Sequence, residues 1–237
     1  DGFTVALDRM RASYFTGNTR LVDPTFVVSS AAAKRHKTIA LAMSAAVAGD
    51  TIMLAPGTYT EDVTFAQDGI KLVGAGAAGY NIAGNTLATG SVITGKINLN
   101  NKKHCIVQDV TVDVRASVKD GIVGGTLAAS TAVLYATIKD VVVVGNGPSA
   151  ACHGILLESG YGNIIDNARI YYCGHGIALR SALTNVSNVY TQNCGISGLI
   201  VKSATTSGDA HDINISNCIF NDGYGVIVEG FDTGTYA

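Results

Sequence analysis

The segment Gly154-Ile-Leu-Leu-Glu158 returns 22 residues later as Gly176-Ile-Ala-Leu-Arg180, and after a further 22 residues as Gly198-Leu-Ile-Val-Lys202. Related copies begin at Gly121 and Gly225, so the steps between the five glycines are 33, 22, 22 and 27 residues. A self-similar period of about 20–50 residues is typical of solenoids, in which each repeat stacks on the next. The phrase therefore predicts a coil of short, stacked segments.

A second phrase, apolar-x-Asp/Asn-x-x-apolar, precedes each copy of the glycine phrase by 8–14 residues. Asn and Asp tolerate left-handed backbone geometry and hydrogen-bond their own backbone at bends. The two phrases together predict short strands separated by tight bends, with the Asx side chains of successive turns stacked into ladders. The Asx residues are Asp109, Asp140, Asn167, Asn188 and Asn217.

Side chains along a strand alternate between its two faces, so the glycine phrase also predicts which residues face the core. The residues one and three places after the glycine are predicted to point inward. They are Ile155, Leu157, Ile177, Leu179, Leu199, Val201, Val226 and Val228. The fourth residue after the glycine would form an outward line, made of Glu158, Arg180, Lys202 and Glu229.

Composition limits the class of protein. The 237 residues carry a formal net charge of −2, with 14% charged and 47% hydrophobic residues, which is too apolar for a disordered chain. The pI of about 6.2 gives no field that would recruit nucleic acid or an anionic membrane. Since no run of about 18 apolar residues occurs, we expect no membrane insertion.

The N-terminal region differs from the repeats. Residues 1–30 lack clear periodicity and are predicted to form an arm or attachment segment, followed by a β-helix over residues 31–237. An Ala-rich stretch at about 31–48 predicts a capping helix, because Ile39, Met43 and Val47 share one face and Gly49 follows. The chain begins with Asp1 and lacks a signal peptide, so we expect a processed product or a fragment, truncated at the C-terminus.

The run from Thr38 to Glu61, an amphipathic helix followed by GDTIMLAPGTYTE, resembles the opening of proteins of the pectate-lyase-like superfamily. The later repeats NVSNVYTQNCGISGLIV and DINISNCIFNDGYGVIV are similar to the coil repeats of the same superfamily. The resemblance covers roughly residues 36–230 and implies an all-β, right-handed, single-stranded parallel β-helix. The superfamily includes polysaccharide lyases, hydrolases, epimerases and bacteriophage tailspikes, so the resemblance specifies the fold more closely than the activity.

The five cysteines, Cys105, Cys152, Cys173, Cys194 and Cys218, contain no CxxC pair and no zinc-like set. Cys173 and Cys194 lie 21 residues apart, about one repeat, and are predicted to stack on adjacent turns. Neighbouring strands are about 4.8 Å apart, a spacing that permits a disulfide. Buried thiols that fill the core are the preferred interpretation.

The outward line of Glu158, Arg180, Lys202 and Glu229 has two interpretations. Opposite charges on neighbouring strands form a stabilising ladder, worth about 0.2–1 kcal/mol per pair. Alternatively, the line borders a groove that binds or cleaves sugar, with Arg180 or Lys202 as base or carboxylate clamp.

His175 is a further catalytic candidate, since Cys-Gly-His-Gly resembles the Gly-His-Gly motif of polygalacturonases. Those enzymes also carry a pair of adjacent aspartates about one turn upstream, where this chain has Ala151-Cys-His-Gly-Ile155. Glycosidic hydrolysis requires two facing carboxyl groups. The match is therefore attributed to the Gly-x-Gly repeat, with His153 and His175 stacked one turn apart.

Two further sets of residues are candidates for ligand binding. Asp109, Asp113 and Asp140 form a weak candidate for a cation site, with Ca²⁺ as the ion, although Asx bends explain the same residues. The chain has no Trp to stack on sugars, and Tyr171 and Tyr190 are the candidates to replace it. The same two tyrosines would equally cover the outer face of the coil. No cofactor other than Ca²⁺ is expected.

The leading functional hypothesis is a bacteriophage tailspike or tail-fibre protein that binds a cell-surface polysaccharide through the flank of the β-helix. Such a protein would be a homotrimer in the virion or outside the cell, attached to other virion proteins through residues 1–30. The first alternative is a polysaccharide lyase, hydrolase or epimerase. The second is a virion decoration or adhesin module without enzymatic activity.

Overall fold

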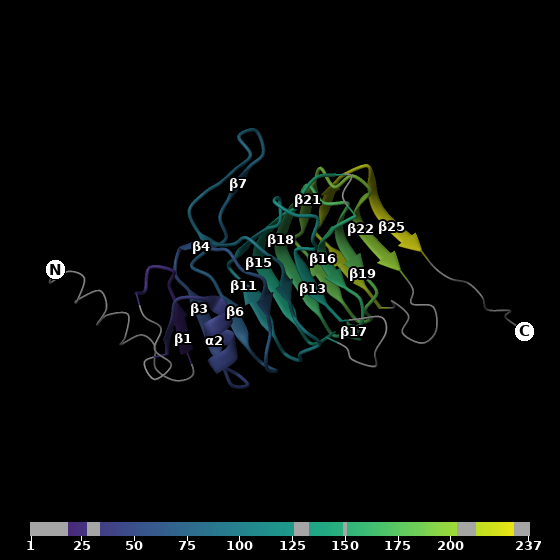
Figure 1. Cartoon of the computed structure of the whole chain (residues 1–237). Coiled ribbons are helices and arrows are strands. Elements are labelled where there is room, and N and C mark those ends of the chain that lie inside the picture. Colours follow the sequence, from purple (N-terminus) through teal and green to yellow (C-terminus); the bar gives the residue numbers. More distant parts are fainter. Residues whose placement is uncertain (1–18, 28–33, 126–132, 149–150, 203–211, 230–237) are drawn as a thin grey trace, which may run out of the picture.

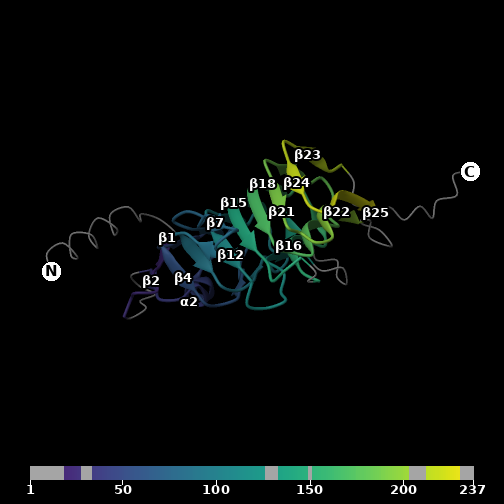
Figure 2. The same ribbon diagram turned by 90° about the horizontal axis from the view of Figure 1, so that it is seen from above.

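The computed structural model describes residues 19–27, 34–125, 133–148, 151–202 and 212–229. Its backbone forms a coil whose parallel strands stack in rows from one turn to the next (Figure 1). Seen from above, the turns follow one another along a single axis (Figure 2). The predicted all-β, single-stranded parallel β-helix is confirmed.

The first row begins each turn. Its strands are β3 (Thr51–Leu54), β6 (Lys71–Val73), β11 (Ile106–Gln108), β15 (Thr137–Val144), β18 (Ile164–Tyr171), β20 (Asn185–Ser187) and β23 (Asn214–Ser216). The second row contains the C-terminal halves of β15 and β18 together with β4 (Gly57–Tyr59), β9 (Ser91–Ile93), β12 (Thr111–Asp113), β21 (Tyr190–Gln192) and β24 (Ile219–Asn221).

The third row completes each turn and is a separate sheet of seven strands. They are β5 (Val63–Thr64), β10 (Ile97–Asn98), β13 (Ile122–Gly124), β16 (His153–Leu157), β19 (His175–Leu179), β22 (Ser197–Lys202) and β25 (Tyr224–Glu229). Two small sheets lie outside the rows, the parallel pair β14 (Val133–Leu134) and β17 (Gly160–Tyr161), and the antiparallel hairpin β7 (Tyr80–Asn81) and β8 (Thr86–Leu87).

The first row continues into the segment predicted as an arm. Strand β1 (Thr19–Val22) pairs in parallel with β3 and with β2 (Arg35–His36). The predicted boundary at residue 30 is therefore wrong for these residues, because their backbone hydrogen bonds join them to the sheet. Residues 1–18 of the predicted arm lie outside the described residues.

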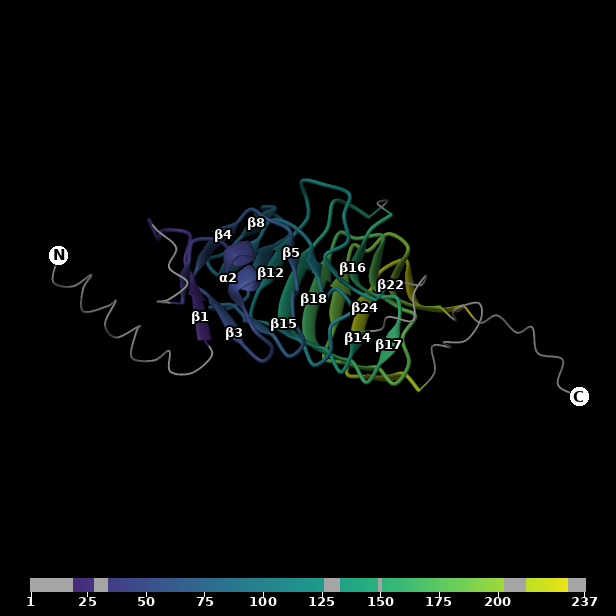
Figure 3. The ribbon, with the colours of Figure 1, turned by 60° about the horizontal axis from the view of Figure 1, so that its bottom comes forward.

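Among the described residues of the helix predicted over 31–48, Ile39–Ala45 form α2, whereas Arg35–His36 form strand β2. Its first amides are satisfied by the carboxylate of Glu61, which accepts hydrogen bonds from Ile39 N and Ala40 N at 2.8 Å each. Ile39, Ala42 and Met43 are buried. The helix packs against β1, β2, β3 and β5 at one end of the coil (Figure 3). Its function as a cap remains a prediction.

The Asx phrase forms the bend between the first and second rows. All five residues have left-handed backbones, with φ between 48° and 57°. The predicted ladders are present, since Asn167 Nδ2 donates to Asp140 Oδ1 at 2.7 Å and Asn217 Nδ2 donates to Asn188 Oδ1 at 2.5 Å. These four bends therefore satisfy part of their polar surface through the neighbouring turn.

Two of the repeat glycines, Gly121 and Gly154, mark close contacts between successive turns. A Cβ on Gly154 would lie 2.6 Å from the carbonyl oxygen of Gly176 and would overlap the Ile170 side chain. A Cβ on Gly121 would meet Val143 and the Gly154 carbonyl in the same way. Heavy atoms cannot approach so closely, so these positions require glycine for space.

The predicted inward positions are confirmed in three turns, where Ile155, Leu157, Ile177, Leu179, Leu199 and Val201 are buried in the core. In the last described turn, Val226 and Val228 keep this inward register, paired with Leu199 and Val201, but nothing described covers them. Val226 is 47% exposed and Val228 is 72% exposed, because no described strand beyond β25 packs on them.

All five cysteines are free, and four of them are buried, as the core-filling interpretation predicts. Cys173 stands between Cys152 and Cys194 on successive turns, within hydrogen-bonding reach of both. Within the described ranges, no helix has the length and apolar character needed to cross a bilayer.

Replacing Gly154 with Ala is expected to lower the free energy of unfolding by about 1–3 kcal/mol, because backbone and Ile170 must move to admit the methyl group. Denaturant unfolding followed by circular dichroism measures the change. The matched control is Gly225→Ala, where the nearest atom to an added Cβ is 3.9 Å away. Equal losses in the two variants would contradict the steric explanation.

Candidate functional site

The outer face of the second row carries a cluster of tyrosines. Strands β18 and β21 pair so that Arg169 lies beside Tyr190, while Ile170 and Thr191 face inward. The rings of Tyr171 and Tyr190 are 6.2 Å apart between centroids. Both tyrosines predicted to bind substrate therefore lie on one face. Arg169 is exposed beside them, whereas Tyr171 is only 7% exposed.

The hairpin of β7 and β8 projects from the coil (Figure 1). It brings Tyr80 to 5.2 Å from the Tyr171 ring and 6.1 Å from the Tyr172 ring. Val142 and Val144 lie beneath these rings in the same apolar cluster. Tyr171 is therefore the buried member of this tyrosine cluster, and Tyr80, Tyr172 and Tyr190 form its accessible part.

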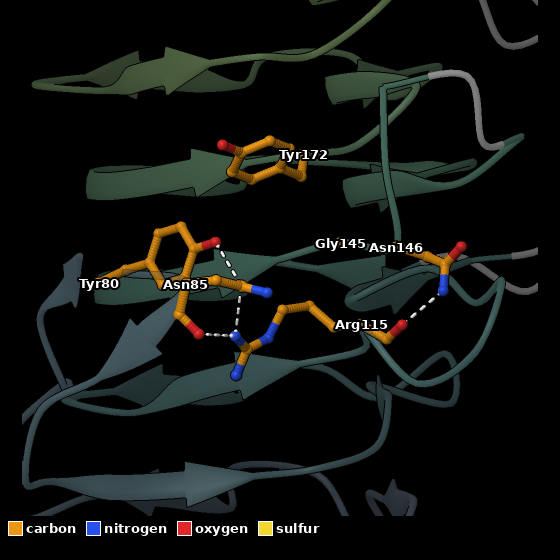
Figure 4. A pocket seen from close by; sticks show the side chains of 6 residues that line it. All are labelled: Tyr80, Asn85, Arg115, Gly145, Asn146 and Tyr172. Carbon is orange, nitrogen blue, oxygen red and sulfur yellow. Dashed lines mark hydrogen bonds between the residues drawn. The ribbon is translucent and has the colours of Figure 1, made fainter. Parts of the chain in front are cut away.

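Arg115 holds the hairpin in place. Its Nε and Nη2 donate to the two carboxylate oxygens of Asp113 at 2.8 and 2.7 Å. Its Nη1 donates to the backbone and side-chain oxygens of Asn85, each at 2.7 Å, and Tyr80 Oη donates to the same Asn85 side chain (Figure 4). Burial opposes ionisation of Asp113, but the hydrogen bonds from Arg115 hold its pKa below the usual value. Most of the donors of Arg115 are therefore occupied by the hairpin and its anchor.

Two neighbouring pockets share Tyr172. The first, of about 320 Å³, opens between the hairpin and the coil, and Figure 4 shows its lining: Tyr80, Asn85, Arg115, Gly145, Asn146 and Tyr172. The second, of about 490 Å³, is lined by Pro148, Tyr172, Asn193, Cys194, Gly195, Asn221, Asp222 and Gly223. Amide and carboxylate groups thus surround an aromatic surface over several turns.

A second polar cluster lies at the N-terminal ends of strands β16, β19 and β22 in the third row. The rings of His153 and His175 stack with centroids 5.3 Å apart and planes 11° apart, as the sequence predicts. Asp120 Oδ1 accepts hydrogen bonds from His153 N at 2.8 Å and Nδ1 at 2.9 Å. Ser197 Oγ lies 2.8 Å from His175 Nδ1. We call these four residues the histidine row.

The members of the histidine row differ in their charge at pH 7. Burial and the neighbouring His153 and Lys202 lower the pKa of His175 to about 4, so this ring is neutral at pH 7. Burial opposes ionisation of Asp120, but the hydrogen bonds from His153 hold the pKa of this carboxyl below its usual value. A charged carboxylate and a neutral imidazole therefore flank His153.

Comparison with known proteins identifies the family. Residues 27–226 match the family model described as rhamnogalacturonase A/epimerase, pectate lyase-like. The chain belongs to this pectate-lyase-like family. No curated protein sequence matches it.

Solved structures share the fold of this pectate-lyase-like chain. The A-module of the Azotobacter vinelandii mannuronan C-5 epimerase AlgE4 has a TM-score of 0.56 and 18% identity, over 88% of this chain and 68% of that module. A pectin methylesterase mutant in complex with a hexasaccharide has a TM-score of 0.51 and 19% identity, over 93% of this chain and 69% of the esterase. A Geobacillus virus E2 protein, ORF18, has a TM-score of 0.44 and 15% identity, over 91% of this chain and 39% of the viral protein. The predicted β-helix fold agrees with the epimerase module and the pectin methylesterase.

The outward line of charged residues forms two ion pairs in this pectate-lyase-like coil. Arg180 Nη1 lies 3.9 Å from Glu158 Oε1, and Lys202 Nζ lies 3.2 Å from Glu229 Oε2. These contacts match the charge-ladder interpretation, and pairs at the surface are worth about 0–1 kcal/mol. His175 lies at the opposite end of its strand from the Arg180 position, and of this line the charges of Lys202 and Glu229 act on its pKa.

The three aspartates of the candidate cation site do not form one cluster. Both oxygens of Asp113 bind Arg115, whereas Asp109 and Asp140 line a different pocket with Asn167 and Arg169. No group of three or more His, Cys, Asp or Glu side chains suited to a metal occurs in the part of the chain that is described. Calcium binding therefore remains a prediction.

Sequence reasoning missed Asp120, Ser197 and the hairpin that carries Tyr80. Asp120 lies 33 residues before His153 and belongs to neither repeated phrase. The hairpin lies in a Gly- and Asn-rich segment without periodicity. The signal that could have found the histidine row is the repeat itself, since each of its four members directly precedes a repeat glycine, at Gly121, Gly154, Gly176 and Gly198.

The low pKa of His175 predicts a loss of stability in acid. The unfolded chain takes up this proton near pH 6.5 and the folded chain only near pH 4, so stability should fall as the pH drops through this window. Unfolding titrations at pH 7, 5.5 and 4 measure this. In the His175→Gln variant, the part of the stability loss that comes from protonation of His175 should be absent. His104→Gln, at another corner of the coil, is the control for loss of any histidine. A constant difference between wild type and His175→Gln across these pH values would contradict the prediction.

Proposed function

We propose that this chain is the polysaccharide-binding part of a bacteriophage tailspike or tail-fibre protein and that it binds a cell-surface glycan along the second row. The pair of pockets that meet at Tyr172 is the observation that carries this proposal. Each pocket combines an aromatic ring with amide or carboxylate groups. Sugars present both apolar C–H faces and hydroxyl groups, so a surface of this composition complements them.

The coil geometry favours a polymer over a single small molecule. Successive turns are about 4.8 Å apart, so equivalent positions recur along the axis. Tyr190 and Gln192 follow Arg169 and Tyr171 in this way, and Asn221 follows Gln192. A glycan chain that lies parallel to the axis would therefore meet a new set of side chains at each turn.

The virion assignment is supported by the sequence. The surface carries few charges, and the chain lacks the carboxylate pair that glycosidic hydrolysis requires at the Gly-His-Gly match. Residues 1–18 of the predicted arm would attach the protein to other virion components, and three copies would assemble through their β-helices. The protein would then act in the virion, outside the host cell.

A polysaccharide lyase, hydrolase or epimerase is the second candidate. The family model names a rhamnogalacturonase and an epimerase, and the fold is shared with the epimerase module of AlgE4. The histidine row is the observation on this chain that favours an activity of this class. A decoration or adhesin module without glycan binding is the remaining alternative.

Replacing Tyr172 with Ala should weaken binding to a glycan selected on an array of bacterial surface polysaccharides. The side chain contributes to both pockets, so we expect a loss of about 5–30-fold, equivalent to one or two kcal/mol. Calorimetric titration measures the affinity. Tyr161→Ala, an exposed tyrosine on a different corner of the coil, is the matched control. Unchanged affinity in Tyr172→Ala, or no binding to any glycan on the array, would refute binding at this site.

The tailspike assignment also predicts an oligomer. Sedimentation equilibrium of the chain, whose mass is 24.4 kDa, should give about three times that mass. A monomer at all concentrations that still binds glycan would separate the two parts of the proposal, since it would retain the binding site and exclude the trimeric tailspike.

A further inference from the structure

Three cysteines lie one above another inside the coil, at the bend between the second and third rows. Cys152, Cys173 and Cys194 follow one another at steps of 21 residues. The backbone places them in register, since Gly174 N donates to the carbonyl of Cys152 and Gly195 N donates to that of Cys173, each at 2.9 Å. Neighbouring strands bring such Cα atoms to about 4.8 Å, inside the range of about 4.4–6.8 Å that a disulfide spans. The backbone therefore holds three thiols in positions that a disulfide can join.

Cys173 is the member of this cluster that contacts both others. Its side chain lies within hydrogen-bonding reach of Cys152 and of Cys194, and all three residues are buried. Gly145 packs against its sulfur, since a Cβ added there would lie 2.6 Å from Cys173 Sγ. A sulfur atom forms one disulfide at a time, so Cys173 can join only one neighbour while the third thiol stays reduced. The cluster therefore offers two alternative cross-links between adjacent turns.

The three thiols differ in their access to solvent. Cys194 lines the second pocket, of about 490 Å³, together with Tyr172. Its backbone is fixed there, because Cys194 N donates to Asp222 Oδ1 at 2.6 Å. Neither Cys152 nor Cys173 is among the described residues that line this pocket. A reagent that enters the pocket therefore meets Cys194 before the other two thiols.

We propose that Cys194 and Cys173 form a thiol–disulfide exchange site. A low-molecular-weight disulfide such as oxidised glutathione reacts at Cys194, and Cys173 then closes a disulfide between adjacent turns. The structure, in which all five cysteines are free, is the reduced form of this site. Disulfides persist in oxidising surroundings such as the outside of a cell, which is where the proposed function would place the protein. The inference does not depend on glycan binding.

Two exchange steps account for the atoms and electrons. The Cys194 thiolate attacks one sulfur of oxidised glutathione, the S–S bond of the reagent breaks, and one glutathione thiolate leaves. Cys173 then attacks the Cys194 sulfur and displaces the second glutathione thiolate. The protons that the two cysteines lose pass through water to the two leaving thiolates. The cysteines are oxidised by two electrons in total, and oxidised glutathione is reduced to two thiols.

Cys152 is placed to assist the second step. The hydrogen bond from Cys173 lowers the pKa of Cys152 to about 6 against the opposing effect of burial, and the backbone amides of Gly174 and Asn146 lower it further. The same hydrogen bond raises the pKa of Cys173, and the contact with Cys194 adds to this effect. Cys173 therefore holds its proton toward a thiolate. Cys152 can accept that proton while Cys173 attacks, and then release it to water.

The test treats the reduced protein with oxidised glutathione and identifies the products by tryptic digestion and mass spectrometry. The five cysteines fall in separate tryptic peptides, with Cys173 in residues 170–180 and Cys194 in residues 181–202. The expected product links these two peptides, and the mass of the intact chain falls by two hydrogens. The melting temperature should rise by about 5–10 °C, because the cross-link restricts the unfolded chain. Dithiothreitol should reverse both changes.

Three variants separate the roles of the cysteines. Cys173→Ser should keep one glutathione on Cys194 as a mixed disulfide, because no second thiol closes the bond. Cys194→Ser should leave the peptide of Cys173 without a link and should abolish the rise in melting temperature. Cys218→Ser is the matched control, since Cys218 lies outside the cluster and is more exposed than its members. It should form the same link as wild type.

A folded wild-type protein that forms no link between residues 170–180 and 181–202 would overturn the proposal. A disulfide between Cys173 and Cys152 in its place would also overturn it, because the reagent would then not act through Cys194. Circular dichroism establishes that each variant is folded. If a serine variant does not fold, the peptide map of the wild type decides, since it requires no substitution.

Discussion

The stacking of one turn directly on the next is the constraint on which the rest of the coil depends, and the repeat glycines show it most clearly. At Gly154 and Gly121 the carbonyl of the following turn occupies the space that a Cβ would need. The backbone of the third row can therefore approach the inward side chains of the second row, such as Ile170. This contact sets the register of the third row, and that register determines which outward side chains become neighbours.

The Asx bends impose the second constraint. Each turn leaves the first row through a left-handed residue, and the side chains at Asp140 and Asn167 bond across the turns. Carboxylates that look like cation ligands in the sequence are therefore used for backbone geometry. The charged line at the other end of the third row is likewise occupied in ion pairs, between Glu158 and Arg180 and between Lys202 and Glu229. Most conspicuous polar residues of this chain thus serve the scaffold.

Several side chains of the candidate sites come from segments where the chain departs from its regular repeat. The hairpin of β7 and β8 is an excursion that places Tyr80 on the tyrosine face, and Arg115 anchors it. Asp120 reaches His153 across a 33-residue step, longer than the regular turns. The coil supplies a rigid frame of regular spacing, and the irregular segments add the groups that make a pocket or extend a polar cluster. This division suits a family in which one fold carries several activities.

The sequence by itself determined the coil, the left-handed Asx bends, the inward rows and the stacking of His153 on His175, since each follows from a spacing of about one turn. It did not determine the strand at Thr19–Val22, the exposure of Val226 and Val228, or the groups that complete the two sites. Repetition fixes which positions stack, because every turn obeys the same backbone geometry. Only the tertiary structure decides where an insertion of irregular length returns, because its path depends on contacts such as those between Arg115 and Asn85, which no period encodes.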